Sequence, residues 1–224
     1  MINNQNTYLM NTDEFNKIPD QLKKQIPTQK VGKCSDTYSS LEIKELNNPD
    51  IAYKSIKHRL LDVNNWAHYA TLTNADFILL DNNGNNLEGL VTEDCFMKVR
   101  FSRLQKIISA RHDYVLVHRI FNVPDFFDDA LIMQLIPAHN PTKPGTEIDH
   151  FFTAEASNTF VLYRDNDKIH LSVHGRNEVP NFKVSKTTKK LRNMVFAALG
   201  IVAVSKVQWK SLAHGLLNYN EKIL

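Results

Sequence analysis

The sequence predicts an α+β fold, with an antiparallel sheet of about six to seven strands packed by an early helix and by C-terminal helices. Strand patterns follow one another between residues 76 and 174 without helices between them, and helical patterns stand before and after this run. The chain also lacks the glycine-rich phosphate-binding motifs of doubly wound α/β domains. Together these features favour a sheet that helices cover from the two ends of the chain.

The composition limits the class of protein. A chain of 224 residues with 42% hydrophobic and 23% charged residues is typical of one globular domain. A net charge of +3 is too weak to indicate a nucleic-acid partner. No sequence motif points to a cofactor, so we expect none.

The cysteines and the apolar runs indicate the compartment. Cys34 and Cys95 are too few to build a zinc cage alone, and we expect two reduced thiols in a soluble, cytoplasmic protein. The first residues lack the basic and apolar regions of a secretory signal. The longest apolar run, residues 194–204, is far shorter than the about 20 residues of a spanning helix, so no membrane span is expected.

The chain divides into a polar arm, residues 1–38, and a single α+β domain, residues 39–224. The arm is rich in Asn, Gln and Lys, and a short helix over residues 13–25 would be ordered only if it docks on the domain. A leader or linker without chemistry is the simpler interpretation of this composition.

The domain begins with a strand and a helix. Residues 41–46 alternate apolar and polar side chains, as in a half-buried strand. Pro49 and Asp50 suit the first turn of a helix, and apolar residues at helical spacing extend that helix over residues 50–62. Trp66 and Tyr69 follow as large side chains that can close one end of a core.

Strand patterns fill the middle of the chain, and the clearest is a β-hairpin around Asp165-Asn166-Asp167. An Asn- and Gly-rich turn over residues 81–86 predicts a return strand. Past residue 180 the pattern becomes helical, with Gly200 as a break between two helices and Ser205 as a cap. The expected strands are 76–80, 87–91, 95–101, 113–121, 130–136, 159–164 and 168–174, and the expected helices are 186–199 and 206–217.

This order of elements resembles the helix-grip fold of START-like and polyketide-cyclase-like domains. The strand at 41–46 and the helical region at 49–69, with Asp62 and Trp66 in the places of the family's Asp and Trp, carry a resemblance that covers residues 40–218. It implies a curved sheet, a long terminal helix over residues 186–217 and an apolar ligand held between them. The loop at 137–145 and Gly200 depart from the family pattern, and the family has no shared catalytic residues to carry over.

Three polar side chains share one face of the last strand, namely His170, Ser172 and His174. The two histidines would be about 13 Å apart along a strand, too far to ligate one metal ion together. We therefore expect no metal site unless further ligands come from His139, His150 or Asp149. Histidines that face solvent or a cavity are the alternative.

The segment from His174 to Glu178 ends this strand. Gly175 permits a bulge or a sharp turn, and Arg176 can make a bidentate contact to a carboxylate or phosphate. A structural pair of Arg176 with Glu178 or Asp149 is the alternative.

Two charged clusters are more simply explained as solvated surface. An acidic loop lacks the spacing of a calcium motif, and a basic group around the strand at 95–101 could form a modest anionic-ligand surface. The acidic residues are Asp125, Asp128 and Asp129, and the basic ones are Lys98, Arg100, Arg103, Lys106 and Arg111.

These observations favour a non-enzymatic module that binds an apolar small molecule or lipid, with no catalytic residue assigned. The residues expected to line the pocket or to orient a polar group are Trp66, Tyr114, Phe160, His170, His174, Arg176 and Trp209. One alternative is a structural or interaction protein that assembles through the arm and the C-terminal helices. A homo-oligomer is the kind of assembly considered. Another is a hydrolase or cyclase whose histidines lie within hydrogen-bond reach of a nucleophile or an acid.

Overall fold

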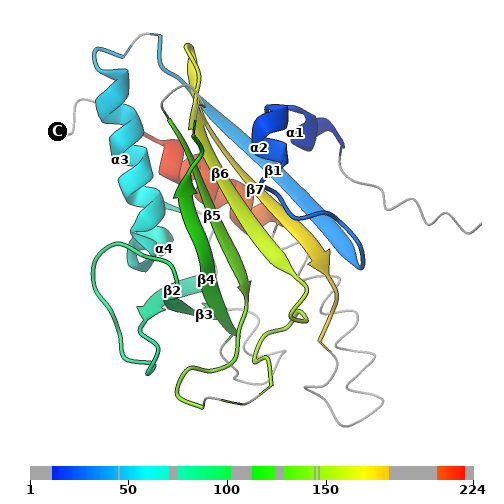
Figure 1. Ribbon diagram of the computed structural model, residues 1–224. Helices are drawn as coiled ribbons and strands as arrows, with labels where there is room; N and C mark the ends of the chain where they lie inside the picture. The colour runs from blue at the N-terminus through cyan, green and yellow to red at the C-terminus, as the bar shows by residue number, and fades with distance from the viewer. Residues whose placement is uncertain are drawn as a thin grey trace, which may run out of the picture.

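One antiparallel sheet of seven strands, in the order β1-β7-β6-β5-β4-β3-β2, forms the centre of the molecule (Figure 1). The structure is a computed structural model that describes residues 12–44, 46–70, 75–101, 113–124, 129–143, 145, 147–181 and 206–219. Helices accompany the sheet before its second strand and after its last, which confirms the α+β prediction.

The elements have the following bounds. The strands are β1 Lys33–Glu42, β2 Ala75–Leu80, β3 Phe96–Phe101, β4 Asp113–Asn122, β5 Ala130–Pro137, β6 Ser157–Arg164 and β7 Lys168–Glu178. The helices are α1 Thr12–Asn16, α2 Asp20–Lys23, α3 Pro49–Leu61, the 3-10 turn Val63–Asn65, α4 Trp66–Tyr69 and a C-terminal helix over residues 206–217.

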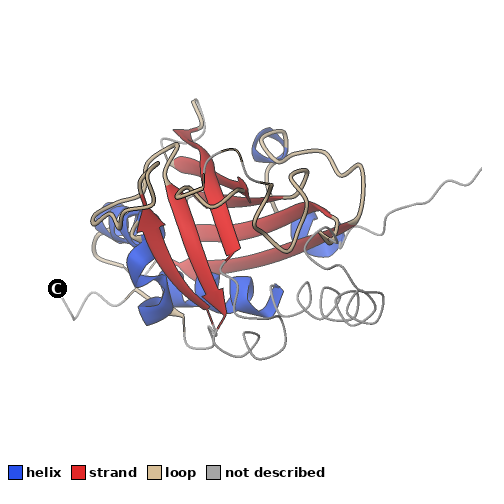
Figure 2. Cartoon of the chain, turned by 90° about the horizontal axis from the view of Figure 1, so that it is seen from below, coloured by secondary structure: helices blue, strands red, loops and turns tan. Residues whose placement is uncertain are grey.

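The sheet is curved and has two covered faces. Strands β2 and β3 run at a steep angle to β6 and β7, so the sheet bends around its inner face (Figure 1). The C-terminal helix crosses this inner face, while α1 and α2 lie on the opposite, outer face (Figure 2). The main core lies on the inner face and joins α3 and the C-terminal helix to the sheet. A smaller outer core packs Ile18, Leu22 and Ile26 of the arm against β5 and β6.

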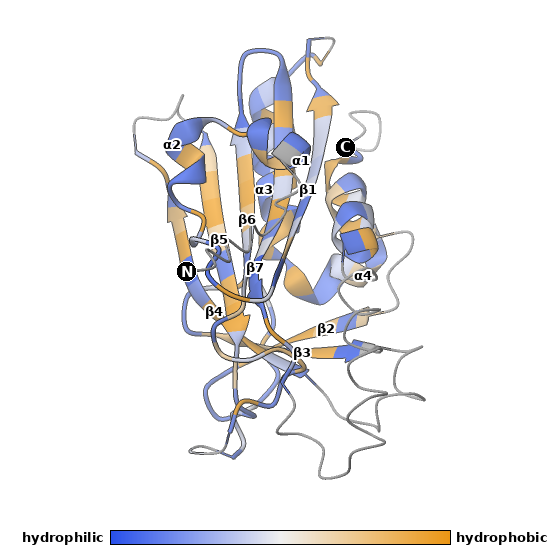
Figure 3. Ribbon diagram, turned by 90° about the vertical axis from the view of Figure 1, so that its right-hand side faces the viewer, coloured by the Kyte–Doolittle hydropathy of each residue, from blue (hydrophilic) through white to orange (hydrophobic). Residues whose placement is uncertain are grey.

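The alternation of β7 decides what each face contains. Ile169, Leu171 and Val173 belong to the inner core, as the sequence predicts. The residues between them, His170 and Ser172, point to the outer face, and they too are buried. The ribbon coloured by hydropathy shows this mixture of polar and apolar positions along the strands (Figure 3).

Helix α3 forms where its capping residues predicted it. The Asn48 side chain accepts a hydrogen bond from the Ile51 amide at 3.1 Å, and Pro49 and Asp50 occupy the first turn. Trp66 follows α3 and is fully buried in the main core.

Three expected elements differ from the observed ones. The strand expected at 41–46 begins at Lys33 and ends at Glu42, so residues 33–38 of the expected arm belong to the sheet. The return strand at 87–91 is wrong, since that stretch has only a bridge between Leu80 and Asn86 beside it. The single arm helix is divided into α1 and α2, because Pro19 interrupts it.

Other expectations concern parts of the chain that the structure does not describe. The helix at 186–199, the Gly200 break, the Ser205 cap and most of the acidic and basic clusters lie outside the described residues. The second C-terminal helix is found over residues 206–217, as expected. Within the described residues, no helix has both the length and the apolar character needed to cross a membrane.

Candidate functional site

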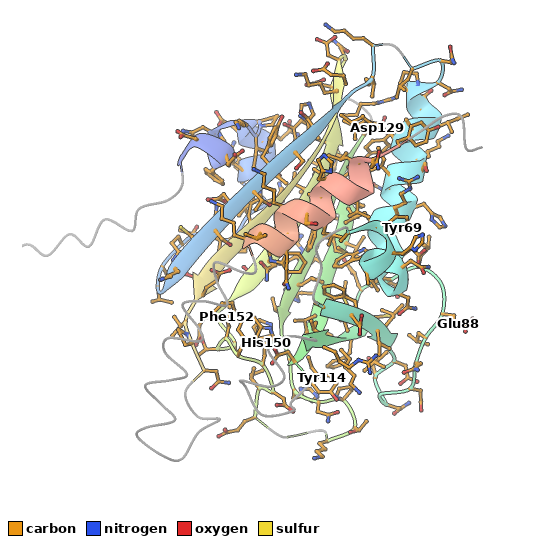
Figure 4. All side chains as sticks on the ribbon, turned by 180° about the vertical axis from the view of Figure 1, so that it is seen from behind. Tyr69, Glu88, Tyr114, Asp129, His150 and Phe152 are labelled. Carbon is orange, nitrogen blue, oxygen red and sulfur yellow. The ribbon has the colours of Figure 1, made fainter. Side chains whose placement is uncertain are left out.

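A cavity of about 40 Å³ lies on the inner face, between the sheet and the start of the C-terminal helix. Four strands, the loop after β5 and the helix contribute its mostly apolar wall, which consists of Phe77, Met97, Val99, Val115, Leu135, Phe151, Phe152 and Trp209. Its polar side chains are His150, Asn158, Glu178 and Gln208. His150 and Phe152 lie below the lower end of the C-terminal helix in Figure 4. Few polar groups in an apolar wall are typical of small-molecule sites.

A β-bulge turns Glu178 into this cavity. Strand alternation from Val173 would place Glu178 on the outer face. Between the pairs Ser35–Gly175 and Lys33–Glu178, β7 has one residue more than β1. Asn177 lies in this bulge and has a positive φ of 55°. Asparagine tolerates this conformation better than most residues. The bulge therefore reverses the alternation at the end of β7.

The Glu178 side chain is 2% exposed and only half satisfied. Its Oε1 accepts a hydrogen bond from the Ser35 hydroxyl at 3.2 Å, whereas Oε2 has no hydrogen-bond partner. Burial raises the pKa of this carboxyl to about 7. A side chain at Gly175 would collide with the Glu178 carboxylate and the Ser35 hydroxyl, so glycine is required beneath them.

Two further polar atoms around the cavity are buried without a hydrogen-bond partner. They are the Asn158 Oδ1 atom on β6 and the Gln208 Nε2 atom on the C-terminal helix. Asn158 is paired with Gly175 across the strands, so its side chain neighbours the Glu178 carboxyl. Since an unsatisfied buried polar atom costs about 1–3 kcal/mol, three around one cavity need an explanation.

His150 is the fourth polar side chain of the cavity, and it is neutral. Its Nδ1 accepts a hydrogen bond from the Phe152 amide at 2.9 Å, which leaves the proton on Nε2. Its ring stacks on Phe151 with 4.2 Å between centroids. Burial lowers the pKa of His150 to about 3.

The raised pKa of Glu178 predicts a specific dependence of stability on pH. The unfolded chain ionises this carboxyl from about pH 4.5 and the folded chain only near 7, so folding binds a proton between these values. The contribution of Glu178 to the free energy of unfolding should therefore fall by up to about 3 kcal/mol as the pH rises through this window. Urea denaturation of the wild-type protein and of Glu178→Gln from pH 4 to 8 measures it.

The difference between the two proteins is the informative quantity. His150 acts in the opposite direction, since the folded chain resists its protonation as the pH falls below 6.5. Asp113, whose pKa burial and Asp149 raise to about 8, acts in the same direction as Glu178. Both contributions cancel in the difference, and a difference that does not change with pH would contradict the assignment to Glu178.

The structure divides the predicted ligand-binding residues between the two faces. Trp209 lines the cavity, and the fully buried Trp66 and Phe160 rings lie behind it, at 6.4 and 5.3 Å from its ring. The other four are not brought to the cavity. Tyr114 packs in a separate cluster with Leu80, Phe96 and Ala138. His174 and Arg176 lie under Phe15 of the arm on the outer face, and His170 lies further along the same face.

The histidine cluster forms a buried hydrogen-bonded chain. His174 Nδ1 lies 2.6 Å from Asp36 Oδ1, and its Nε2 lies 2.9 Å from the Ser172 hydroxyl. The charges and hydrogen bonds of His174 and Arg176 outweigh burial and hold the pKa of Asp36 below its ordinary value. Asp36 therefore accepts a hydrogen bond from the Nδ1–H of His174, and the Ser172 hydroxyl donates a hydrogen bond to the Nε2 of His174.

The hydrogen-bonded series Asp36–His174–Ser172 has the order of a catalytic triad, with a histidine within reach of a hydroxyl and an acid. All three side chains have an exposed fraction of 0%. The Phe15 ring of α1 contacts His174 edge-on, with 5.8 Å between ring centroids. The Arg176 guanidinium lies over the Phe15 ring. These hydrogen-bonded residues therefore hold β1, β7 and the arm together, and no substrate can reach them while the arm is docked.

His170 occupies a separate polar contact further along β7. It lies 2.5 Å from the Tyr38 hydroxyl and 2.8 Å from Asp165 Oδ2, and it stacks on Tyr163. In the described part of the chain, no group of three or more His, Cys, Asp or Glu side chains could hold a metal ion.

Sequence reasoning missed Asn158, Glu178 and Gln208. The sequence places Glu178 at the end of the last strand and indicates it only as an alternative partner of Arg176. The signal that could have found it is the glycine at 175 followed by an asparagine at 177, a pair of residues that favours a bulge. Gln208 and Asn158 carry no such signal, because only the packing of the helix on the sheet buries them.

Comparisons with known proteins add information on the fold alone. No protein-family model and no curated protein matches the chain. Among solved structures, a hypothetical protein from Helicobacter pylori is similar, with 10% identity, a TM-score of 0.50 and coverage of 83% of this chain and 87% of the other.

Two further solved structures are similar more weakly. Ara h 8.0201 shares 9% identity with a TM-score of 0.34, covering 83% of this chain and 99% of the other. The ginseng major latex-like protein 151 from Panax ginseng shares 13% identity with a TM-score of 0.33, covering 78% and 99%. Scores this low support no conclusion about function. The likeness to the Helicobacter pylori structure shows that this chain shares its fold.

Proposed function

We propose that the protein binds an apolar small molecule in the cavity between the sheet and the C-terminal helix. The observation that carries this proposal is the combination of an aromatic and aliphatic wall with three buried polar atoms that have no partner. A ligand that buries apolar surface and satisfies these atoms would recover the free energy that their desolvation costs.

The size of the cavity constrains how a ligand enters. A volume of about 40 Å³ holds only a few atoms, whereas typical ligand pockets have about 300–1,000 Å³. The bulk of a ligand must therefore displace a side chain of the wall. Trp209 is the best candidate, because it is partly exposed and stands on the helix that closes the cavity, while Trp66 and Phe160 behind it are fully buried.

A fluorescence titration with the neutral apolar dye N-phenyl-1-naphthylamine tests the proposal. Trp209→Ala should enlarge the cavity and strengthen dye binding at least about threefold, because the ligand no longer displaces the indole. Val115→Phe should fill the cavity and weaken binding about tenfold or more.

Val207→Ala is the matched control, since this side chain is 58% exposed on the same helix and should leave binding unchanged. Circular dichroism confirms that each variant is folded. Equal dye binding by the wild-type protein, Trp209→Ala and Val115→Phe would show that the dye binds elsewhere, and the proposal would be wrong.

A further inference from the structure

We propose that Glu178 and Gln208 bind the carbonyl oxygen of the ligand between two hydrogen-bond donors, so that the cavity selects apolar molecules that carry a carbonyl group. This inference rests on the proposed function of the cavity. It follows from which atoms of the two side chains are already engaged and which remain for a ligand.

The geometry around Glu178 fixes where its proton sits when the carboxyl is neutral. The Ser35 hydroxyl donates to Oε1, so that oxygen acts as an acceptor. The proton of the neutral acid is therefore on Oε2, the oxygen without a partner. Glu178 is buried and lines the cavity, so the neutral acid offers an O–H donor to a ligand.

Gln208 offers the second donor from the opposite side. Its Nε2 is buried without a partner, and an amide nitrogen can only donate. Glu178 comes from the sheet and Gln208 from the helix that closes the cavity. A carbonyl oxygen has two lone pairs and can accept from both donors at once, which a hydrocarbon cannot do.

Asn158 extends the recognition to a second group. Its Oδ1 is an acceptor beside Glu178, so it cannot bind the carbonyl oxygen itself. An N–H or O–H next to the carbonyl group would satisfy it. The site as a whole therefore suits a carbonyl compound better than an amine or a simple hydrocarbon.

The charges around Glu178 allow this donor to exist near neutral pH. Burial and Asp36 favour the neutral form and outweigh the Ser35 hydrogen bond, Arg176 and Lys33, which favour the ionised form, so the pKa is raised to about 7. His150, the other titratable side chain that lines the cavity, is neutral and supplies no charge there. Above pH 7 the carboxyl ionises, the donor is lost and a negative oxygen faces the carbonyl oxygen.

Three probes of one shape test the inference, namely acetophenone, 1-phenylethanol and ethylbenzene. Their dissociation constants are measured by protein-observed NMR titration at pH 6 and pH 8.5. At pH 6 acetophenone should bind about tenfold more tightly than ethylbenzene, the typical value of a net hydrogen bond. This advantage should vanish at pH 8.5. 1-Phenylethanol can donate a hydrogen bond to the carboxylate, so its affinity should fall less than that of acetophenone.

Two variants separate the donors from the shape of the cavity. Glu178→Gln replaces the acid O–H by an amide N–H, so the preference for acetophenone should persist and become independent of pH. Gln208→Leu removes the second donor at similar volume and should weaken acetophenone about threefold, a part of the tenfold preference, with ethylbenzene unchanged. Glu88→Gln, at an exposed carboxyl, is the matched control and should behave as the wild-type protein.

The outcomes distinguish the two proposals. If all three probes bind equally at both pH values, the cavity binds apolar ligands and the carbonyl inference is wrong. A pH dependence that persists in Glu178→Gln would also overturn it. If none of the probes binds at all, the proposed function of the cavity fails, and the inference fails with it.

Discussion

Replacing Asp36 by alanine is expected to lower the free energy of unfolding by about 3–5 kcal/mol, because it leaves a buried guanidinium without its counter-charge. Arg176 Nη2 donates to Asp36 Oδ1 at 2.8 Å, and the two side chains are 2% and 0% exposed. The other hydrogen bonds of Arg176 go to the neutral carbonyl groups of Ser35 and Gly175. Urea denaturation at pH 7, followed by circular dichroism, measures the loss.

A double variant and a surface pair provide the controls. Asp36→Ala combined with Arg176→Met removes both charges and should recover a large part of the lost stability. Asp76→Ala removes an exposed partner of Arg100 and should cost less than about 1 kcal/mol. If Asp36→Ala is as stable as Asp76→Ala, the buried pair does not hold the outer face together.

The same pair predicts how the protein responds to acid. The pKa of Asp36 is lower in the folded chain than its ordinary value of 3.8, so its contribution to stability is complete above that value. It is lost as the pH falls through the folded-state pKa. Since the arm covers this pair, protonation of Asp36 should loosen the arm from β1 and β7.

Replacing Trp66 by alanine is expected to cost a similar 3–5 kcal/mol, through the loss of a large buried side chain and the cavity that remains. The indole ring contacts Phe77 and Phe160 with centroid distances of 5.1 and 5.2 Å. Its Nε1 donates to the Leu60 carbonyl at 3.0 Å, which fixes the turn after α3. Circular dichroism during urea denaturation measures the change without relying on tryptophan fluorescence.

The conservative variant separates packing from the hydrogen bond. Trp66→Phe retains most of the buried apolar area and should cost markedly less than Trp66→Ala. Ile51→Ala is the matched control in α3, because its side chain is 47% exposed. A loss below about 1 kcal/mol for Trp66→Ala would mean that the aromatic cluster does not organise the inner core.

Local patterns were sufficient for much of the fold. The capping residues of α3 and the Asp-Asn-Asp turn of the last hairpin predicted their elements to within a few residues, because such signals act over one turn of chain. The strand β1 was placed too late, since residues 35–40 show no apolar alternation. The outer side chain of Asp36 is polar and yet fully buried, because Arg176 and His174 satisfy it beneath the arm.

The candidate site could be predicted only in part. The rings of Trp209, Trp66 and Phe160, which were expected from the sequence in a ligand pocket, pack against one another, and their contact with a ligand stays a prediction. The prediction that His174 and Arg176 share a surface with them was wrong, because simple alternation continued to the end of β7 puts these two residues on the opposite face. They form the anchor of the arm instead.

The sequence by itself determined the α+β class, helix α3, the last hairpin and the two faces of β7, because periodicity, capping and turn residues are local properties. Only the tertiary structure decided where the polar chemistry lies. The bulge at Asn177 depends on pairing with β1, more than a hundred residues earlier in the chain, and it turns Glu178 from the outer face to the inner one. The burial of Glu178, Asn158 and Gln208 around one cavity arises from long-range packing, which no local pattern specifies.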